Sequence, residues 1–280
     1  MTEPVSKQRR QKALGIIKRL RLMDDDFMKR CLKDNKPAVE CILRIIMDMP
    51  DLNVQTIHIE DTIPSLQGRG VRLDVHAIDT TGKEYDIEVQ RSDKGASKKR
   101  ARFNSSMLDI NSLQSGDDFE LLPETYVIFI TEHDVLKHGL AVYRIERMIQ
   151  GINCPFDDKE HIIFVNGAYQ GNDNIGKLMH DFRSSNPNDM LLEPLKETVY
   201  RYKNNPEEVV RMCKEIEDWM KEERAEGEAT GEARGEARGK ENERMNSIRA
   251  IMDTAGVTAE KAMEMLKIDK SLWKKYMALL

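Results

Sequence analysis

Apolar residues recur at helical spacing in several parts of the chain. The strongest stripe runs through residues 37–49, and a second one runs through the basic residues 1–23. A third predicted helix covers residues 96–114, with Phe103, Met107 and Ile110 on one face. Side chains three and four positions apart lie on the same side of a helix, so each stripe predicts a helix that buries one face.

Strand patterns separate these helices. Residues 71–78 and 85–90 alternate around the polar turn DTTGK, which predicts a β-hairpin, and residues 51–63 are predicted to be extended before it. The runs YVIFIT at 126–131 and HIIFV at 161–165 are short and continuously apolar, as in strands that are buried on both faces. Residues 142–149 form one more candidate strand.

The C-terminal part of the chain contains a four-residue repeat, AEGEATGEARGEARGK, at 225–240. Each glycine costs a helix about 1 kcal/mol relative to alanine, and like charges four residues apart repel each other. Two interpretations remain open: a flexible spacer, or a helix whose glycine rows allow two chains to approach closely. Residues 244–280 resume an amphipathic pattern, which predicts a small helical tail.

Composition narrows the class of protein. The chain has 280 residues, 40% hydrophobic and 33% charged, as in a soluble globular protein. The net charge of −5 conceals basic blocks in residues 1–23 and 94–102, so a nucleic-acid partner is not excluded. The four cysteines form no CxxC pair, no apolar run approaches the roughly 20 residues of a membrane span, and no secretory signal is present. We therefore expect a cytoplasmic protein with reduced thiols.

The hairpin carries an unusual set of polar side chains. If its turn is centred on Thr81, Asp74 lies opposite Glu88, and opposed residues of an antiparallel pair share a face. Asp86 and Gln90 fall on the same face. Carboxylates about 5 Å apart repel each other, and a shared divalent cation such as Mg²⁺ would offset this repulsion. A solvated polar face followed by a basic segment is the alternative interpretation.

A set of motifs resembles one family. RLDVHAIDTTGKEYDIEVQ, at 72–90, resembles the core motif of PD-(D/E)XK nuclease folds, and the chain is similar to the PD-(D/E)XK nuclease family transposases, related to the recombination-promoting (Rpn-type) nucleases of bacteria. The resemblance extends over roughly residues 20–280 and includes the four-residue repeat. Further matching stretches are LMDDDFM at 22–28, KKRARFNSSMLD at 98–109, PETYVIFITEHD at 123–134, IIFVNGAY at 162–169 and GKLMHDF at 176–182.

The resemblance implies an α/β fold: an αβββαβ core with a mixed central sheet and a helical C-terminal extension. We place the nuclease-like domain at residues 24–185. The other segments are a basic lead-in (1–23), a helical extension (186–224), the repeat as linker or helix (225–243) and the helical tail (244–280).

The resemblance also implies a metal-dependent DNA endonuclease site that uses Mg²⁺ (or Mn²⁺). Asp74 and Glu88 match the metal-binding carboxylates, and Glu40, on the helix at 37–49, matches the acidic residue that often completes the site. The backbone carbonyl of Val89 is a further expected ligand. Gln90 stands where the name-giving motif has lysine, and we assign it the orientation of the attacking water. An amide can bind a water or a phosphate oxygen, but it brings no charge and cannot act as a base.

The segment after Gln90 is rich in basic residues. We expect Arg91, Lys98, Arg100 and Arg102 to bind DNA. The expected function is a DNA endonuclease, with a non-catalytic DNA-binding or interaction module as the alternative. The helical C-terminal region is a candidate for homo-oligomer formation, and no membrane partner is expected.

Overall fold

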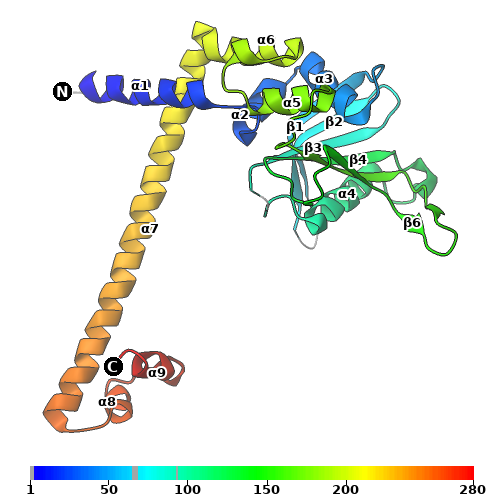
Figure 1. Cartoon of the computed structure of the whole chain (residues 1–280). Helices are drawn as coiled ribbons and strands as arrows, with labels where there is room; N and C mark the ends of the chain where they lie inside the picture. The colour runs from blue at the N-terminus through cyan, green and yellow to red at the C-terminus, as the bar shows by residue number, and fades with distance from the viewer. Residues whose placement is uncertain (1–2, 65–68, 93) are drawn as a thin grey trace. The chain divides into compact units, whose positions relative to one another are not determined.

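The computed structural model describes residues 3–64, 69–92 and 94–280. The chain divides into two compact units, Met1–Cys213 and Lys214–Leu280. The first unit contains a mixed β-sheet with helices on both faces, and the second is helical (Figure 1). Among the described residues, none of the helices combines the length and the apolarity that crossing a bilayer requires.

Three helices precede the sheet: α1 (Glu3–Arg19), α2 (Asp25–Leu32) and α3 (Lys36–Met47). The Asn35 side chain caps α3 by accepting a hydrogen bond from the Ala38 backbone N–H. Pro37 lies in the first turn, where the N–H that proline lacks would have no helical partner. The helix ends at Asp48, whose left-handed φ of 58° turns the chain towards the sheet.

The sheet begins with an antiparallel meander of β1 (Val54–Ile63), β2 (Val71–Asp79) and β3 (Glu84–Gln90). Two strands then run parallel to β3: β4 (Thr125–Thr131) beside it and β8 (Glu160–Asn166) beside β4. The edge strand β5 (Val142–Ile145) pairs antiparallel with β8, which gives the order β1-β2-β3-β4-β8-β5. The succession α3-β1-β2-β3-α4-β4 confirms the predicted αβββαβ core with a mixed sheet.

Two short elements depart from the predicted strands. Only Val142–Ile145 of the candidate strand at 142–149 joins the large sheet. The two residues of β6 (Met148–Ile149) pair instead with β7 (Cys154–Pro155) in a separate ribbon.

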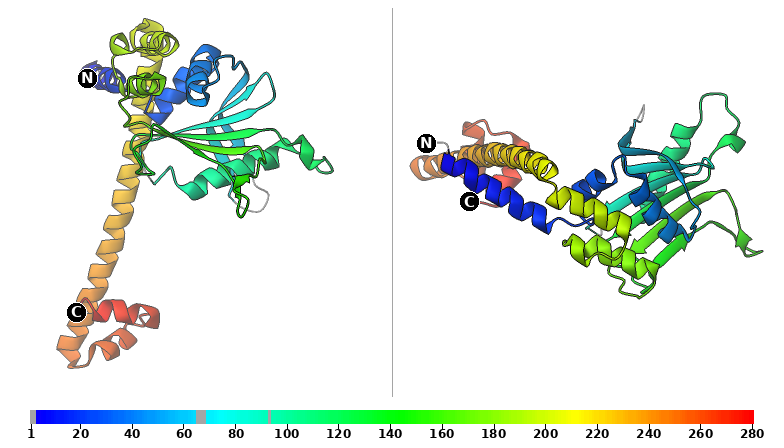
Figure 2. Two further views of the ribbon diagram at one scale, coloured as in Figure 1. Left: turned by 45° about the vertical axis from the view of Figure 1, so that its right-hand side comes forward. Right: turned by 90° about the horizontal axis from the view of Figure 1, so that it is seen from above.

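Helices cover both faces of the sheet. One face carries α4 (Lys98–Ser112), and the other carries α3 together with α5 (Asn174–Arg183) and α6 (Glu193–Asn204) (Figure 2). Val127 and Phe129 on β4 point to the α4 face and pack against Ala101 and Leu108 of that helix. Asp86 pairs with Val127 and Glu88 with Phe129 in the parallel ladder, so both carboxylates also point towards α4.

The buried face of α4 differs from the predicted one. Phe103 and Ile110 are 36% and 65% exposed, and of the three predicted residues only Met107 is buried. Asn104 and Ser105 face inward with it. Apolar periodicity failed here because the helix covers a polar part of the sheet, and polar side chains are needed opposite the buried carboxylates.

The second unit contains most of α7 (Pro206–Ala255), followed by α8 (Ala259–Met265) and α9 (Lys270–Met277). The four-residue repeat lies within α7 and is helical. The predicted helical tail has its own small core, in which Ile248, Met263 and Tyr276 are buried.

Candidate active site

The β2–β3 hairpin sets the geometry of the site. Its register pairs Val75 with Ile87 and Ile78 with Glu84, which centres the turn on Thr81 as predicted. The Asp79 carboxylate fixes this turn by accepting hydrogen bonds from the backbone N–H of Thr81 and from the Tyr85 hydroxyl. The same register, continued by one residue, brings Asp74 opposite Glu88.

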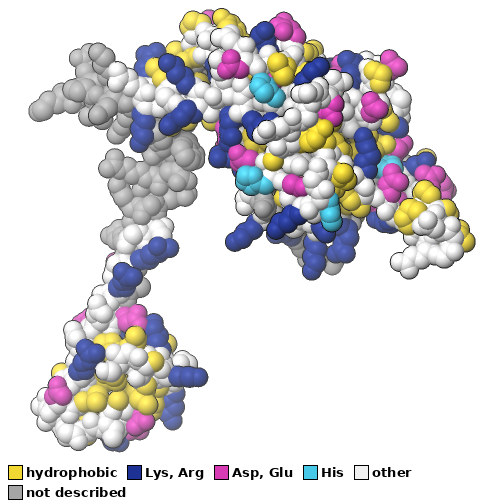
Figure 3. All heavy atoms as spheres, viewed as in Figure 1, with side chains coloured by type: hydrophobic (Ala, Val, Ile, Leu, Met, Phe, Trp, Pro, Cys, Tyr) yellow, Lys and Arg dark blue, Asp and Glu magenta, His cyan; other side chains and the backbone are white. Residues whose placement is uncertain are grey.

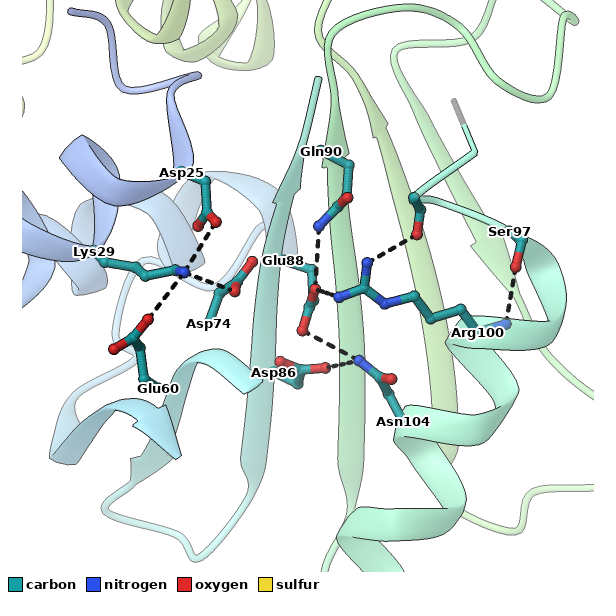
Figure 4. A network of polar contacts seen from close by, with 11 residues as sticks. Asp25, Lys29, Glu60, Asp74, Asp86, Glu88, Gln90, Ser97, Arg100 and Asn104 are labelled. Carbon is teal, nitrogen blue, oxygen red and sulfur yellow. Dashed lines mark hydrogen bonds and ion pairs between the residues drawn. The ribbon is translucent and has the colours of Figure 1, made fainter. Parts of the chain in front are cut away.

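Glu88 is fully buried on the α4 side of the sheet. Asn104 donates to one of its oxygens (3.2 Å) and to Asp86 Oδ2 (2.9 Å), so one amide bridges the two carboxylates (Figure 4). Arg100 forms an ion pair with the other Glu88 oxygen and also donates to the Gly95 carbonyl (3.1 Å). The Ser97 side chain caps α4 by accepting from the Arg100 backbone N–H, which positions this first turn beside Glu88.

Asp74 meets a different cation. Its Oδ1 lies 3.3 Å from Nζ of Lys29, a buried lysine on α2. The same ammonium contacts Asp25 Oδ2 at 2.9 Å and Glu60 Oε1 at 3.4 Å, so three carboxylates surround one lysine (Figure 4). Lys29 and Arg100 thus bring positive charge to the two carboxylates of the motif from two different helices.

Gln90 lies at the end of β3 beside Glu88. Its amide nitrogen is 3.4 Å from Glu88 Oε2. Its amide oxygen lies against Gly95, where a Cβ atom would be 1.9 Å away. A side chain at position 95 would therefore displace this amide from its present position.

The buried carboxylates have perturbed pKa values. Burial, followed by the negative charges of Asp86 and Asp74, raises the pKa of Glu88 to about 9, although Arg100 and the Asp74 backbone N–H, which donates to the Glu88 carboxylate, act in the opposite direction. Burial also raises the pKa of Asp86 to about 7, with a further contribution from Asp74. Burial and the repulsion between these carboxylates together thus outweigh the compensation that Arg100 and Asn104 supply.

The oxygen atoms of the site can be tested as ligands for a divalent cation. Among the described side chains, Asp25 Oδ1, Asp74 Oδ2 and Asp86 Oδ1 are buried without a hydrogen-bond partner. No three His, Cys, Asp or Glu side chains of the described residues already form a metal cage. Mg²⁺ needs only one or two carboxylates and keeps several waters, so these unsatisfied hard oxygens fit such an ion.

Val89 can contribute only its backbone, because its side chain is buried on the opposite face of β3. The Gln90 carbonyl accepts from the Glu132 backbone N–H on the β4 side. Successive carbonyls of a strand point in opposite directions, so the Val89 carbonyl points towards β2 and Asp74. This direction is compatible with the predicted role.

The structure does not bring Glu40 into the site. Glu40 Oε1 accepts a hydrogen bond from the Val54 backbone N–H (2.9 Å), and Oε2 lies 3.1 Å from Arg44. Val54 pairs with Asp79, five residues from Asp74 along β2, which corresponds to roughly 16 Å at the usual strand rise. Glu40 therefore joins α3 to the start of β1, and the prediction that it completes the site is corrected.

The four predicted DNA-binding residues have different surroundings. Lys98 and Arg102 are exposed on α4. Figure 3 shows several Lys and Arg side chains projecting from the lower side of the first unit. Arg100 is half-buried against Glu88. Arg91 is exposed but pairs with Asp24 (2.9 Å) and Glu132 (3.3 Å). The structure therefore separates Arg100, which reaches a motif carboxylate, from the other three.

Sequence reasoning missed Asp25, Lys29 and Asn104. Lys29 is 45 residues from Asp74 in the chain, so no local pattern links the two. The only available signals were the stretch LMDDDFM, directly before Lys29, and the polar positions 104 and 105 within an otherwise periodic helix.

His76 lies on the same strand as Asp74, but its side chain joins β1 to β3. It is buried between Asp61 Oδ2 (2.8 Å from Nδ1) and Glu84 Oε2 (3.1 Å from Nε2). Both carboxylates raise its pKa against the opposing effect of burial.

Comparison with known proteins gave one match. The model of the family described as PD-(D/E)XK nuclease family transposase matches residues 32–174, which is half of the chain and includes Asp74, Glu88 and Gln90. No curated protein and no solved structure matched. The matched segment contains the whole αβββαβ core and the carboxylates beside α4. The chain therefore belongs to the PD-(D/E)XK nuclease family transposases.

Proposed function

We propose that this protein is a Mg²⁺- (or Mn²⁺-) dependent DNA endonuclease of the recombination-promoting (Rpn) type, acting in the bacterial cytoplasm. Membership of the nuclease family supports the reaction class and the DNA substrate. The observation that carries the proposal is that Asp74 and Glu88 lie opposite each other in the hairpin, where Asp74 has a buried oxygen without a partner and Glu88 a pKa that the charge of Asp74 helps to raise.

Asp74 and Glu88 would hold the ion, with the Val89 carbonyl as a third protein ligand. A divalent cation bound there lowers the pKa of a bound water and polarises the phosphodiester. Asp86 shares the Asn104 amide with Glu88. The bond from Asn104 to one Glu88 oxygen and the ion pair of Arg100 with the other hold the Glu88 side chain in one orientation at the site.

Gln90 orients the attacking water. Its amide group lies beside Glu88 and against Gly95 of the following loop. A lysine at this position would bring a positive charge, which an amide does not.

Lys29 and Arg100 supply the positive charge that Gln90 lacks. Both contact a motif carboxylate, and each comes from a helix beside the sheet rather than from β3. A fixed cation next to a reacting phosphate stabilises the charge that develops in the transition state. Exposed Lys98 and Arg102 would bind the flanking backbone phosphates, and Arg91 would exchange its carboxylate partners for phosphate.

The test is cleavage of plasmid DNA with Mg²⁺, combined with DNA binding measured in EDTA. We expect Asp74→Ala and Glu88→Ala to abolish cleavage and to retain binding. Equal, slow nicking by the wild type and both variants would reject the endonuclease proposal.

One observation favours a second candidate, a non-catalytic module that binds DNA through the nuclease fold. Asp74 and Glu88 each already have a cationic side chain as a partner, Lys29 and Arg100 respectively. The two candidates differ in metal binding, because a module that has lost hydrolysis does not need an ion at these carboxylates.

A further inference from the structure

The C-terminal unit contains two short helices joined by a tight turn. Residues 266–269 connect α8 to α9, and Lys267 within this turn has a left-handed φ of 54°. The Ile268 backbone N–H donates to the Met263 carbonyl, which closes the turn. Two helices joined by three or four residues, often with glycine in the turn, are the signature of a helix-turn-helix. Lys267 occupies the conformation that glycine usually provides.

The inner faces of the two helices share one core with the end of α7. Met263 of α8 and Tyr276 of α9 are buried against Ile248 of α7. The Trp273 indole N–H donates to the Ile268 carbonyl (2.9 Å), which ties α9 to the turn. These contacts fix α9 on a three-helix support and leave its other face outside the core.

The outer face of α9 is basic. The helix reads KSLWKKYM and contains no acidic residue. Lys270, Ser271 and Lys274 are exposed, and Lys267 adds a fourth exposed polar side chain at the preceding turn. Asp269, which directly precedes α9, is occupied as the helix cap through the Ser271 backbone N–H (2.8 Å). Lys275 is held by Glu241 at 2.8 Å and is therefore part of the support.

We propose that α8 and α9 form a helix-turn-helix that binds duplex DNA, with α9 as the helix that enters the major groove. A basic helix face held on a small helical support is complementary in charge and shape to that groove. Lysine donates to guanine O6 and N7, and serine bonds to either kind of base pair. This binding function lies beyond the nuclease core and does not depend on whether the core cleaves DNA.

The experiment uses the full chain with Glu88→Gln, in EDTA, so that no cleavage interferes. The affinity for a random 30-base-pair duplex is measured at several salt concentrations for this parent and for the added pair Lys270→Ala/Lys274→Ala. The matched control is Lys240→Ala/Lys261→Ala, which removes the same charge from exposed lysines of this unit that pair with Glu236 and Glu264. Circular dichroism checks that helix content is unchanged.

We expect the α9 pair to weaken binding about tenfold or more and to reduce the slope of log affinity against log salt by about 2, with the control close to the parent. An equal loss in the control would overturn the proposal, because it would show attraction by net charge alone. Unchanged affinity in the α9 pair would also overturn it. The exposed Met277 and Leu279 would then point to a protein partner. Absence of cleavage in the separate plasmid assay would leave this result unaffected.

Discussion

Nζ of Lys29 lies 3.3 Å from Oδ1 of Asp74, so a helix that precedes the core brings a cation to the first carboxylate of the nuclease motif. Lys29 is buried and has two further carboxylate partners, Asp25 and Glu60. Desolvation would lower its pKa, but its hydrogen bond to Asp25 and the charge of Asp74 outweigh that effect and raise it. The side chain is therefore a permanent cation at neutral pH.

Replacing Lys29 distinguishes its effect on the cleavage rate from its effect on metal binding. Lys29→Met is expected to lower the cleavage rate about 10²–10³-fold, the usual effect of losing one electrostatic contact to a transition state. The same change is expected to tighten Mg²⁺ binding, because the positive charge beside Asp74 is gone. Cleavage kinetics and calorimetric titration of the metal measure the two effects.

Lys33→Met is the matched control for Lys29, since Lys33 is exposed at the end of the same helix. Lys29→Arg keeps the charge and should restore part of the rate. Parallel losses of rate and of Mg²⁺ affinity in Lys29→Met would show that the lysine only supports the fold.

Arg100 and Arg102 provide a matched pair on one helix. Arg100 contacts Glu88, whereas Arg102 is exposed. Arg100→Ala is expected to reduce cleavage about 10²-fold or more at saturating DNA. Arg102→Ala is expected to weaken DNA binding at low salt and to leave the rate at saturation unchanged. The comparison requires rates at several DNA concentrations, and identical behaviour of the two variants would contradict it.

Glu88 is expected to destabilise the metal-free protein above its ordinary pKa of 4.5. Its pKa is raised to about 9, so the folded state binds more protons than the unfolded state between these values. The contribution of Glu88 to the free energy of unfolding is therefore fully present below about pH 4.5 and is lost as the pH rises towards 9. Glu88→Gln should raise the free energy of unfolding by about 1–2 kcal/mol at pH 8 and by little at pH 4.5.

Urea unfolding in EDTA at the two pH values measures this difference for the wild type and Glu88→Gln. A variant that is less stable than the wild type at pH 8 would show that the Arg100 ion pair outweighs burial and carboxylate repulsion.

Substitution of Glu40 tests whether this residue joins α3 to the start of β1 and lies outside the metal site. Glu40→Ala removes the acceptor of the Val54 N–H and should lower the free energy of unfolding by about 1–3 kcal/mol. Mg²⁺ at a hundred times its Kd should still stabilise this variant by about 2.7 kcal/mol, as it does the wild type. Thermal unfolding with and without Mg²⁺ checks both effects. Loss of the Mg²⁺ effect in Glu40→Ala would place Glu40 back in the site.

The hairpin could be predicted from sequence because strand periodicity and turn chemistry are local. Two alternating segments around DTTGK fixed the centre at Thr81, and opposed residues then followed by counting. The αβββαβ order was implied by the family resemblance, whose motifs lie in order along the chain.

The surroundings of the carboxylates could not be predicted in this way. Lys29 reaches Asp74 across 45 residues, and Asn104 reaches Asp86 across 18. The inward face of α4 was mispredicted for the same reason, because Asn104 is buried on that face as the partner of Asp86 and Glu88 on β3. Glu40 was misplaced because a helix position does not show which end of the hairpin the side chain reaches.

We propose that Asp74 and Glu88 support metal-dependent hydrolysis of DNA even though Gln90 stands in place of lysine. The most direct measurement is the conversion of supercoiled plasmid to nicked or linear DNA by the wild type, Asp74→Ala and Glu88→Ala, each with Mg²⁺, Mn²⁺ or EDTA. We expect conversion by the wild type with a divalent ion only, and a rate at least about 10²-fold lower in both variants. Wild-type protein that binds the plasmid but converts none with either ion, or variants that match its rate, would contradict it.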